Sequence, residues 1–348
     1  MGNIGRLCFV GLIGASSALA VAAESLPGIH AAQINDQGEY LNTEETLDHG
    51  SLGVRLPFFL RRLGTYFRDG QGAPELQPND GDDLRQPGTQ ARATWIGHAT
   101  FLVQMGGMTF LTDPIWSDVA SPVPPLGPRR FVAPGVEIDD LPDIDFVLIS
   151  HNHYDHLDIP TLRRLSDRNA ATVFVVPEGN KAILHRAGIN NVREANWGEQ
   201  LRLGALTVYC LPSQHWSKRS LTDTNKALWS SWAVLSESKR FYHAGDTGYF
   251  PGFASIGKAL GPFDLAALPI GAYAPRQMMK SFHMNPEEAA QAARDLNANA
   301  VVGMHFGTFD LSDEPLDEPP ARFRHAAAEL GISAKRLWIM NIGETRAF

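Results

Sequence analysis

The sequence SHNHYDHLD at residues 150–158 holds four potential metal ligands within six residues. They are three imidazoles and one carboxylate: His151, His153, Asp155 and His156. The run DFVLIS at residues 145–150 is apolar and β-branched, which predicts a buried parallel strand that ends where the ligands begin. Ligands gather at the carboxyl ends of strands in open α/β sheets. Imidazole and carboxylate donors without a nearby thiolate favour zinc and leave iron and manganese open.

The composition is that of a globular protein with a large core. The chain has 348 residues, 44% hydrophobic and 20% charged, which fits one large domain or two closely packed halves. A formal net charge of -8 argues against a nucleic-acid partner, because phosphate backbones select basic surfaces. The two cysteines, Cys8 and Cys210, offer no disulfide framework, and Cys210 is expected to be a buried thiol in a strand.

Residues 1–23 have the layout of a secretory signal peptide. One basic residue, Arg6, precedes an apolar span at residues 7–22 that ends in small residues. Cleavage is expected after Ala20 or Ala23, and retention of the span as a membrane anchor is the alternative. The predicted mature protein is periplasmic or secreted.

Residues 24–90 are read as an N-terminal extension to a hydrolase domain at residues 91–348. The extension is polar and loop-rich apart from residues 54–68, where apolar side chains recur at helical spacing after Pro57. These side chains are Phe59, Leu60, Leu63 and Phe67. The amphipathic helix they predict is expected to pack on or near the core, and contact with a lipid surface is the alternative.

Strands and helices alternate through the domain and predict an α/β fold. Two strands flank a turn at Gly97 and His98 within residues 93–104, and a third at 108–113 follows two glycines, as in a hairpin. Asp113 ends that strand before a proline, where its carboxylate could orient a ligand histidine; a turn or capping role is the alternative. Helices are expected at residues 160–168, 180–187, 286–296 and 321–330.

Further ligand-type residues stand at later strand ends. His215 follows a strand at residues 206–211, Asp246 follows one at 240–243, and His305 ends one at 300–307. A lone histidine is usually structural, but repeated ligand-type residues at strand ends predict one shared site. His283 lies in a loop before Asn285, which is expected to cap a helix.

These residues resemble the metallo-β-lactamase fold superfamily, whose site uses His-x-His-x-Asp-His, then a later histidine, an aspartate and a final histidine. The resemblance implies a four-layer αβ/βα sandwich of two mixed sheets with helices outside. It implies two divalent ions, with zinc preferred. One ion would be bound by His151, His153 and His215, the other by Asp155, His156 and His305, and Asp246 would bridge both.

A narrower resemblance is to the N-acylphosphatidylethanolamine-hydrolysing phospholipase D family. The sequence segments that match this family are residues 95–100, 111–116, 127–130, 214–216, 245–249, 261–266, 269–273 and 305–309. The resemblance implies that His283 lies near the scissile phosphate, and His98 and Asp113 are expected to support the ligands. Residues 277–279 and the N-terminal region differ from the sequence pattern of this family. The identity of the lipid substrate therefore stays open.

The expected function is phosphodiester hydrolysis of such phospholipids by a hydroxide held between the two ions. Asp155, Asp246 and His283 are the catalytic candidates. A metal-dependent lactonase or other carboxylic-ester hydrolase is the first alternative, and a β-lactamase is another. A metal- or lipid-binding envelope protein without activity is the non-enzyme alternative. The sequence does not decide whether the protein contacts a membrane surface or forms a homodimer.

Overall fold

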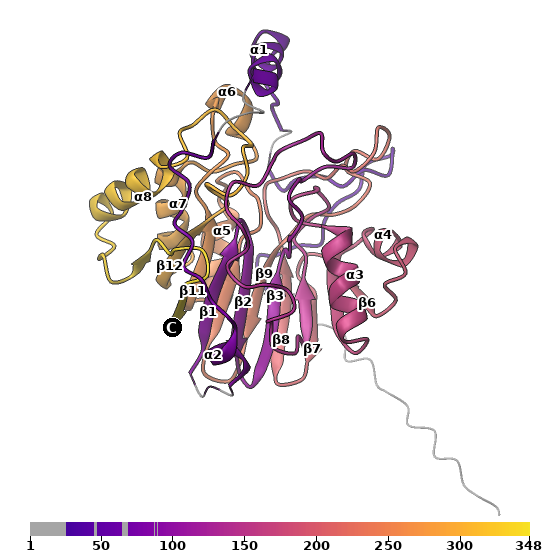
Figure 1. Cartoon of the computed structure of the whole chain (residues 1–348). Helices are drawn as coiled ribbons and strands as arrows, with labels where there is room; N and C mark the ends of the chain where they lie inside the picture. Colours follow the sequence, from indigo (N-terminus) through magenta and orange to yellow (C-terminus); the bar gives the residue numbers. More distant parts are fainter. Residues whose placement is uncertain (1–25, 45–46, 65–68, 87, 89) are drawn as a thin grey trace, which may run out of the picture.

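The computed structural model describes residues 26–348 except 45–46, 65–68, 87 and 89. Two seven-stranded mixed sheets lie face to face, and helices cover their outer faces (Figure 1). The predicted αβ/βα sandwich is therefore confirmed. The predicted signal peptide at residues 1–23 lies outside the described residues. Within the described ranges, no helix has both the length and the apolar character needed to cross a bilayer.

The first sheet has the strand order β14-β1-β2-β3-β4-β5-β6. Its strands are β1 (Arg92–Gly97), β2 (Thr100–Met105), β3 (Met108–Thr112), β4 (Phe146–Leu148), β5 (Val173–Pro177), β6 (Val192–Ala195) and β14 (Thr345–Ala347). The predicted hairpin is present, because β2 and β3 pair antiparallel across Gly106 and Gly107. From β3 to β6 the strands are parallel, as the apolar run before His151 predicted.

The second sheet has the order β13-β12-β11-β10-β9-β8-β7. Its strands are β7 (Gln200–Leu203), β8 (Leu206–Leu211), β9 (Ser231–Leu235), β10 (Arg240–His243), β11 (Phe263–Pro269), β12 (Ala298–Met304) and β13 (Leu337–Trp338). Strands β7 to β10 are antiparallel and β10 to β13 are parallel. The short strands β6, β7 and β14 were not predicted, since four residues or fewer carry little periodicity.

Helices α3 and α4 lie on the first sheet, and α5, α7 and α8 on the second (Figure 1). The helices are α1 (Leu52–Gly64), α2 (Asp82–Arg85), α3 (Ile159–Arg168), α4 (Lys181–Arg186), α5 (Gly252–Leu260), α6 (Arg276–Met279), α7 (Pro286–Asp295) and α8 (Glu318–Glu329). The four helices predicted within the hydrolase domain correspond to α3, α4, α7 and α8. Asn285 caps α7 as expected, and Glu288 completes a capping box.

The main core lies between the sheets. Phe110 of β3 and Phe146 of β4 stack at 4.7 Å between ring centroids, and Phe110 meets Phe241 of the opposite sheet edge-on at 5.9 Å. Val147 points to the other face and packs with Leu162 of α3. Strand β4 is thus buried on both faces, which explains its unbroken apolar sequence.

The N-terminal helix corrects one expectation. It begins at Leu52, and Pro57 lies inside it. Among the described side chains of α1, Phe58 is buried and packs against Met279 and Phe282. Phe59 and Leu60, which were expected to face the core, are 52% and 59% exposed. Helical spacing groups side chains on one face but does not say what covers that face, and here α1 stands beyond the sandwich (Figure 1).

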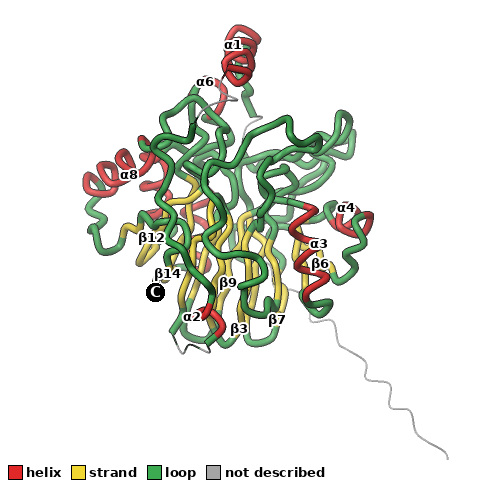
Figure 2. Tube along the Cα trace, in the orientation of Figure 1, coloured by secondary structure: helices red, strands yellow, loops and turns green. Residues whose placement is uncertain are grey.

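The strands deliver the candidate site to one end of the sandwich. Long loops gather at the end toward α1 and α6, whereas tighter turns close much of the opposite end (Figure 2). The loop after β4 carries His151 to His156, and the loops after β8 and β10 carry His215 and Asp246. Both sheets therefore contribute to the same end.

Candidate metal centre

The loop after β4 turns back on itself. The backbone N–H groups of His156 and Leu157 donate to the carbonyl oxygen of His153 at 3.1 and 2.9 Å. This turn brings the side chains of His151 and His156 together, with ring centroids 4.2 Å apart. Four donors close in sequence thus become neighbours around one point.

A first group of donors consists of His151, His153 and His215. The Nδ1 atom of His153 lies 2.9 Å from Nε2 of His151 and 3.2 Å from Nε2 of His215. The first two residues come from the first sheet and the third from the second. This is the trio expected to share one ion.

A second group consists of Asp155, His156 and His305, joined by His98. The Nε2 atoms of His156 and His305 lie 3.2 Å apart, and each is 3.4 Å from Oδ2 of Asp155. The predicted second trio is therefore also assembled. His98 lies on its outer side and donates from Nε2 to the same Asp155 oxygen at 2.9 Å.

Asp246 lies between the two groups. Its Oδ2 is 3.2 Å from Nε2 of His156 and its Oδ1 is 3.1 Å from Nε2 of His305. The same Oδ2 is 3.8 Å from Nε2 of His151 and 3.9 Å from Nε2 of His215. Among the residues that the structure describes, Asp246 is the one carboxylate within 4 Å of donors from both groups, the position that a bridging ligand requires.

Outer hydrogen bonds direct imidazole lone pairs into the centre. His215 donates from Nδ1 to the carbonyl of Phe282 at 3.0 Å, and His156 donates from Nδ1 to Asp113 at 2.9 Å. Ser150 gives its hydroxyl proton to Asp113 at 2.7 Å, so its oxygen accepts from Nδ1 of His151 at 2.9 Å. In all three rings Nδ1 is engaged outward and Nε2 faces inward, which is the orientation that lets Nε2 bind a metal ion.

The electrostatics also suit a cation. Burial opposes charge on His156, but the carboxylates of Asp246, Asp155 and Asp113 outweigh it and raise its pKa. Burial also lowers the pKa of His305, but the carboxylates of Asp246 and Asp155 together raise it more strongly, so that the pKa rises to about 9. Three carboxylates, of which Asp113 and Asp246 are buried, thus stabilise positive charge at this point. Together with the inward lone pairs, they show that the residues present fit a metal centre.

Asp113 occupies the supporting position expected of it. Its carboxylate is fully buried and accepts from the backbone N–H of Ser150 at 2.6 Å as well as from His156. It also accepts from Nε2 of His243 at 2.9 Å. His243 was not predicted as a site residue, because a lone histidine at a strand end is usually structural; its place three residues before Asp246 was the available signal.

His283 lies at the edge of the centre. Its Nδ1 is buried, has no hydrogen-bond partner among the described residues and is 3.9 Å from Oδ2 of Asp246. Arg276 holds the loop by donating to the His283 carbonyl at 2.8 Å and to both oxygens of Glu288 at 2.8 Å. Burial lowers the pKa of His283 to about 4. The imidazole is therefore a neutral, directed hydrogen-bonding group.

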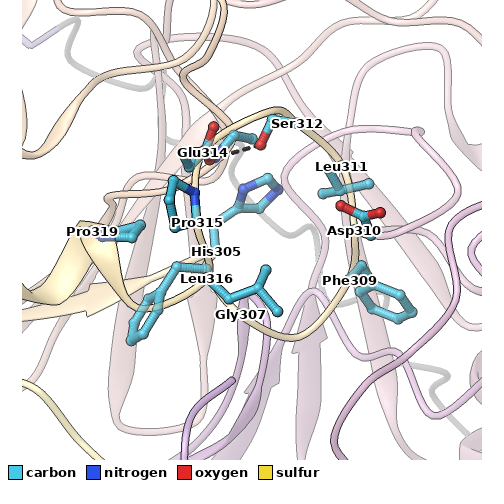
Figure 3. A pocket seen from close by; sticks show the side chains of 12 residues that line it. His305, Gly307, Phe309, Asp310, Leu311, Ser312, Glu314, Pro315, Leu316 and Pro319 are labelled. Carbon is cyan, nitrogen blue, oxygen red and sulfur yellow. Dashed lines mark hydrogen bonds between the residues drawn. The ribbon is translucent and has the colours of Figure 1, made fainter. Parts of the chain in front are cut away.

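Two supporting residues carry no sequence signal. Asn42, from the N-terminal extension, accepts from the His215 backbone N–H at 3.0 Å and donates to its carbonyl at 2.8 Å. Glu314 is buried in the loop that surrounds His305, where Ser312 donates to it at 2.7 Å (Figure 3). Glu314 also accepts from the backbone N–H of Ala272 at 2.6 Å. These bonds fix the backbones beside His215 and His305.

An apolar wall adjoins the first donor group. The Trp216 ring meets the His153 ring at 4.5 Å, and the Phe282 ring lies 6.1 Å from that of His215. Phe58 of α1 packs behind Phe282. Such a wall beside polar donors suits a substrate with an apolar part.

Comparison with known proteins agrees with this geometry. The family model described as Beta-lactamase superfamily domain matches residues 108–306, which contain every residue of both donor groups except His98. The chain belongs to this superfamily. It is a metal-dependent hydrolase with the metallo-β-lactamase fold, and it resembles the N-acylphosphatidylethanolamine-hydrolysing phospholipases D.

Three relatives illustrate the extent of the similarity. The chain is 46% identical over 229 residues to N-acyl-phosphatidylethanolamine-hydrolyzing phospholipase D 1 of Caenorhabditis elegans, which covers 63% of this chain and 64% of that protein. It is 37% identical over 326 residues to an uncharacterized protein of Mycobacterium tuberculosis, covering 91% and 86%. The metallo hydrolase Igni18 of Ignicoccus hospitalis superposes with a TM-score of 0.57 at 25% identity, covering 75% and 99%.

Proposed function

We propose that this hydrolase is a phospholipase D-type phosphodiesterase that acts on N-acylphosphatidylethanolamine-like phospholipids with two divalent ions, zinc being preferred. The observation that carries the proposal is the position of Asp246 between two complete donor groups. Two ions held a few ångströms apart lower the pKa of water and neutralise charge on the attacking and leaving oxygens of a phosphoryl displacement.

The residues of the centre would have different roles in binding the two ions. His151, His153 and His215 would hold one ion, and Asp155, His156 and His305 the other, with Asp246 shared. Asp113 and His98 orient His156 and Asp155 through the hydrogen bonds described above. In this assignment Asp155 and Asp246 would offset only part of the charge of two divalent ions, which would leave a net positive centre for a phosphodiester anion.

His283 is the residue proposed to touch the substrate. Its Nδ1 lies 3.9 Å from Oδ2 of Asp246 and has no hydrogen-bond partner among the described residues. A neutral imidazole protonated at Nδ1 can donate to a non-bridging phosphoryl oxygen and align the phosphorus for in-line attack. Arg276 donates to the His283 carbonyl and the capping box of α7 follows two residues later, so the backbone that carries the ring is held.

The apolar wall and the relatives support a lipid substrate. Trp216 and Phe282 flank the donors, where acyl chains could lie. The nematode relative carries the name of a phospholipase D. A formal net charge of -8 disfavours a nucleic acid as the phosphodiester.

Contact with a membrane surface is part of the proposal. Leu52, Leu56, Phe59 and Leu60 are each more than half exposed and recur at helical spacing on α1, at the same end as the metal centre. We propose that this face rests on a lipid surface after export directed by residues 1–23. The N-terminal mass of protein recovered from the periplasm or medium tests the export, since cleavage would place the first residue near position 21 or 24.

The deciding experiment is lipid analysis after incubation of metal-loaded protein with an envelope lipid extract. The expected result is loss of N-acylated phosphatidylethanolamine with release of phosphatidic acid. A lactone and a carboxylic-ester panel are run beside it. Faster turnover of a lactone would show that the protein is a lactonase or another carboxylic-ester hydrolase. Absence of turnover of every ester at full metal loading would favour a metal- or lipid-binding protein without activity. Fewer than two metal equivalents in active protein would reject the two-ion centre.

A further inference from the structure

We propose that His243 is a positioning residue that holds the two halves of the metal centre in register by bonding Asp113 across the gap between the sheets. The inference rests on the metal centre proposed above. It concerns the assembly of the site and not the identity of the substrate.

The bond joins the two sheets directly behind the ligands. Asp113 follows β3 of the first sheet in a left-handed conformation, with φ of 37°, and His243 ends β10 of the second sheet. Nε2 of His243 lies 2.9 Å from Oδ2 of Asp113, and both side chains are 0% exposed. A non-glycine residue at positive φ costs energy, so the direction of this carboxylate is maintained by its contacts.

Asp113 is shared by donors that serve both halves. Its Oδ2 accepts from His243 and from His156 at the same distance of 2.9 Å, while Ser150 binds both of its oxygens. The backbone N–H of Ser150 donates to the other oxygen, Oδ1, at 2.6 Å, so the carboxylate is the acceptor around which these groups gather. Both rings therefore donate to it.

Packing alone does not explain an imidazole at position 243. Its Nδ1 is buried without a hydrogen-bond partner among the described residues. An unsatisfied buried polar atom is costly, and an apolar ring would fill the space without that cost. The bond to Asp113 is the contact that requires a histidine.

The carboxylate of Asp113 is linked to two metal-ligand candidates, His156 and Asp246, each through a short series of contacts. On one side, His156 uses its other nitrogen, Nε2, to approach Oδ2 of Asp246 at 3.2 Å. On the other side, Asp246 is three residues beyond His243, and Gly245 between them lies so close to the first sheet that an added Cβ would come within 2.5 Å of Ser150 Cβ. The cross-sheet bond therefore sets how far His156 lies from Asp246.

Other bonds join the sheets and leave the fold independent of His243. Ser230 donates its backbone N–H to the carbonyl of Ser150 at 2.8 Å, and Trp232 donates from its indole to the carbonyl of Ile149 at 3.0 Å. Removal of the His243 bond should thus disturb the centre without separating the sheets.

The test compares His243→Phe, which fills the space without a donor, with His243→Gln, whose amide N–H can reach Asp113. Stepwise zinc affinities are measured against a competing chelator in the absence of substrate, with circular dichroism as the check of folding. In His243→Phe the second zinc equivalent is expected to bind 10- to 100-fold more weakly, about the effect of losing a residue that orients a ligand, with the first unchanged. His243→Gln is expected to restore most of that affinity.

Each outcome is decisive. Unchanged affinity for the second equivalent in folded His243→Phe, or a glutamine variant as weak as the phenylalanine variant, would overturn the proposal. Failure of both His243→Phe and His243→Leu to fold would assign the residue a purely structural role and overturn it as well. A wild-type protein that binds fewer than two equivalents would instead refute the proposed centre, which separates the two failures.

Discussion

His215 donates its Nδ1–H to the carbonyl oxygen of Phe282 across 3.0 Å. This bond ties an imidazole of the first donor group to the loop that also carries His283. The bond thereby links the ligand His215 to Phe282 of the apolar wall and to the neighbouring His283, the proposed substrate contact.

Arg276 should control turnover without controlling metal binding. Arg276→Met removes the bonds to the His283 carbonyl and to Glu288, so the His283 loop can shift. A displacement of about 1 Å can cost up to ~100-fold in rate, and kcat is expected to fall within that limit. Steady-state kinetics and metal analysis check this. Arg322→Met, which removes a comparable pair with Glu287, is the control; normal kcat in Arg276→Met would remove the positioning role.

Asp246 should be indispensable for hydrolysis and dispensable for folding. Asp246→Asn loses the charge near His156 and His305, so the second donor group should bind metal poorly. Activity is expected to fall by more than about 100-fold, since even residues that only support ligands cost 10–100-fold. Asp295→Asn, whose carboxylate accepts from Tyr249 away from the centre, serves as control. Wild-type turnover in Asp246→Asn would refute the assignment.

The exposed face of α1 should bind lipid. Replacement of Phe59 and Leu60 together by serine removes two side chains worth about 1.5–3 kcal/mol each when buried in an apolar phase. Sedimentation with phosphatidylethanolamine–phosphatidylglycerol vesicles should show at least a tenfold loss of binding. Hydrolysis of a short-chain, water-soluble substrate should stay unchanged, because Phe58 makes the contact with the site. Equal loss in Ile34→Ser, an exposed residue elsewhere, would contradict a specific role.

Cys210 should be unreactive in the native protein. Burial raises the pKa of its thiol, and the Sγ atom donates to the Ala195 carbonyl at 3.5 Å. In a Cys8→Ser background, a thiol-specific reagent at pH 8 is expected to label no cysteine until denaturant is added, and then one per chain. Rapid labelling of native protein would show that the strand opens far more readily than its burial implies.

Local sequence predicted the parts of this protein that depend on neighbours in the chain. The run before His151 predicted a doubly buried strand, and Asn285 with Glu288 predicted the start of a helix. His151 to His156 predicted a metal site, because a single turn can bring them together. The assignment of His215, Asp246 and His305 to the same site needed the family pattern as well, since strand ends share an edge only once the sheets are formed.

Tertiary structure decided what depends on distant partners. Asp113 and His243 are 130 residues apart, and Asn42 and His215 are 173 apart, so no local pattern relates them. The exposure of Phe59 and Leu60 was likewise decided by what α1 packs against. A periodic sequence determines which side chains share a face and which strand ends offer ligands. Which of those faces is buried, and which buried group orients each ligand, follows from how the two sheets pack.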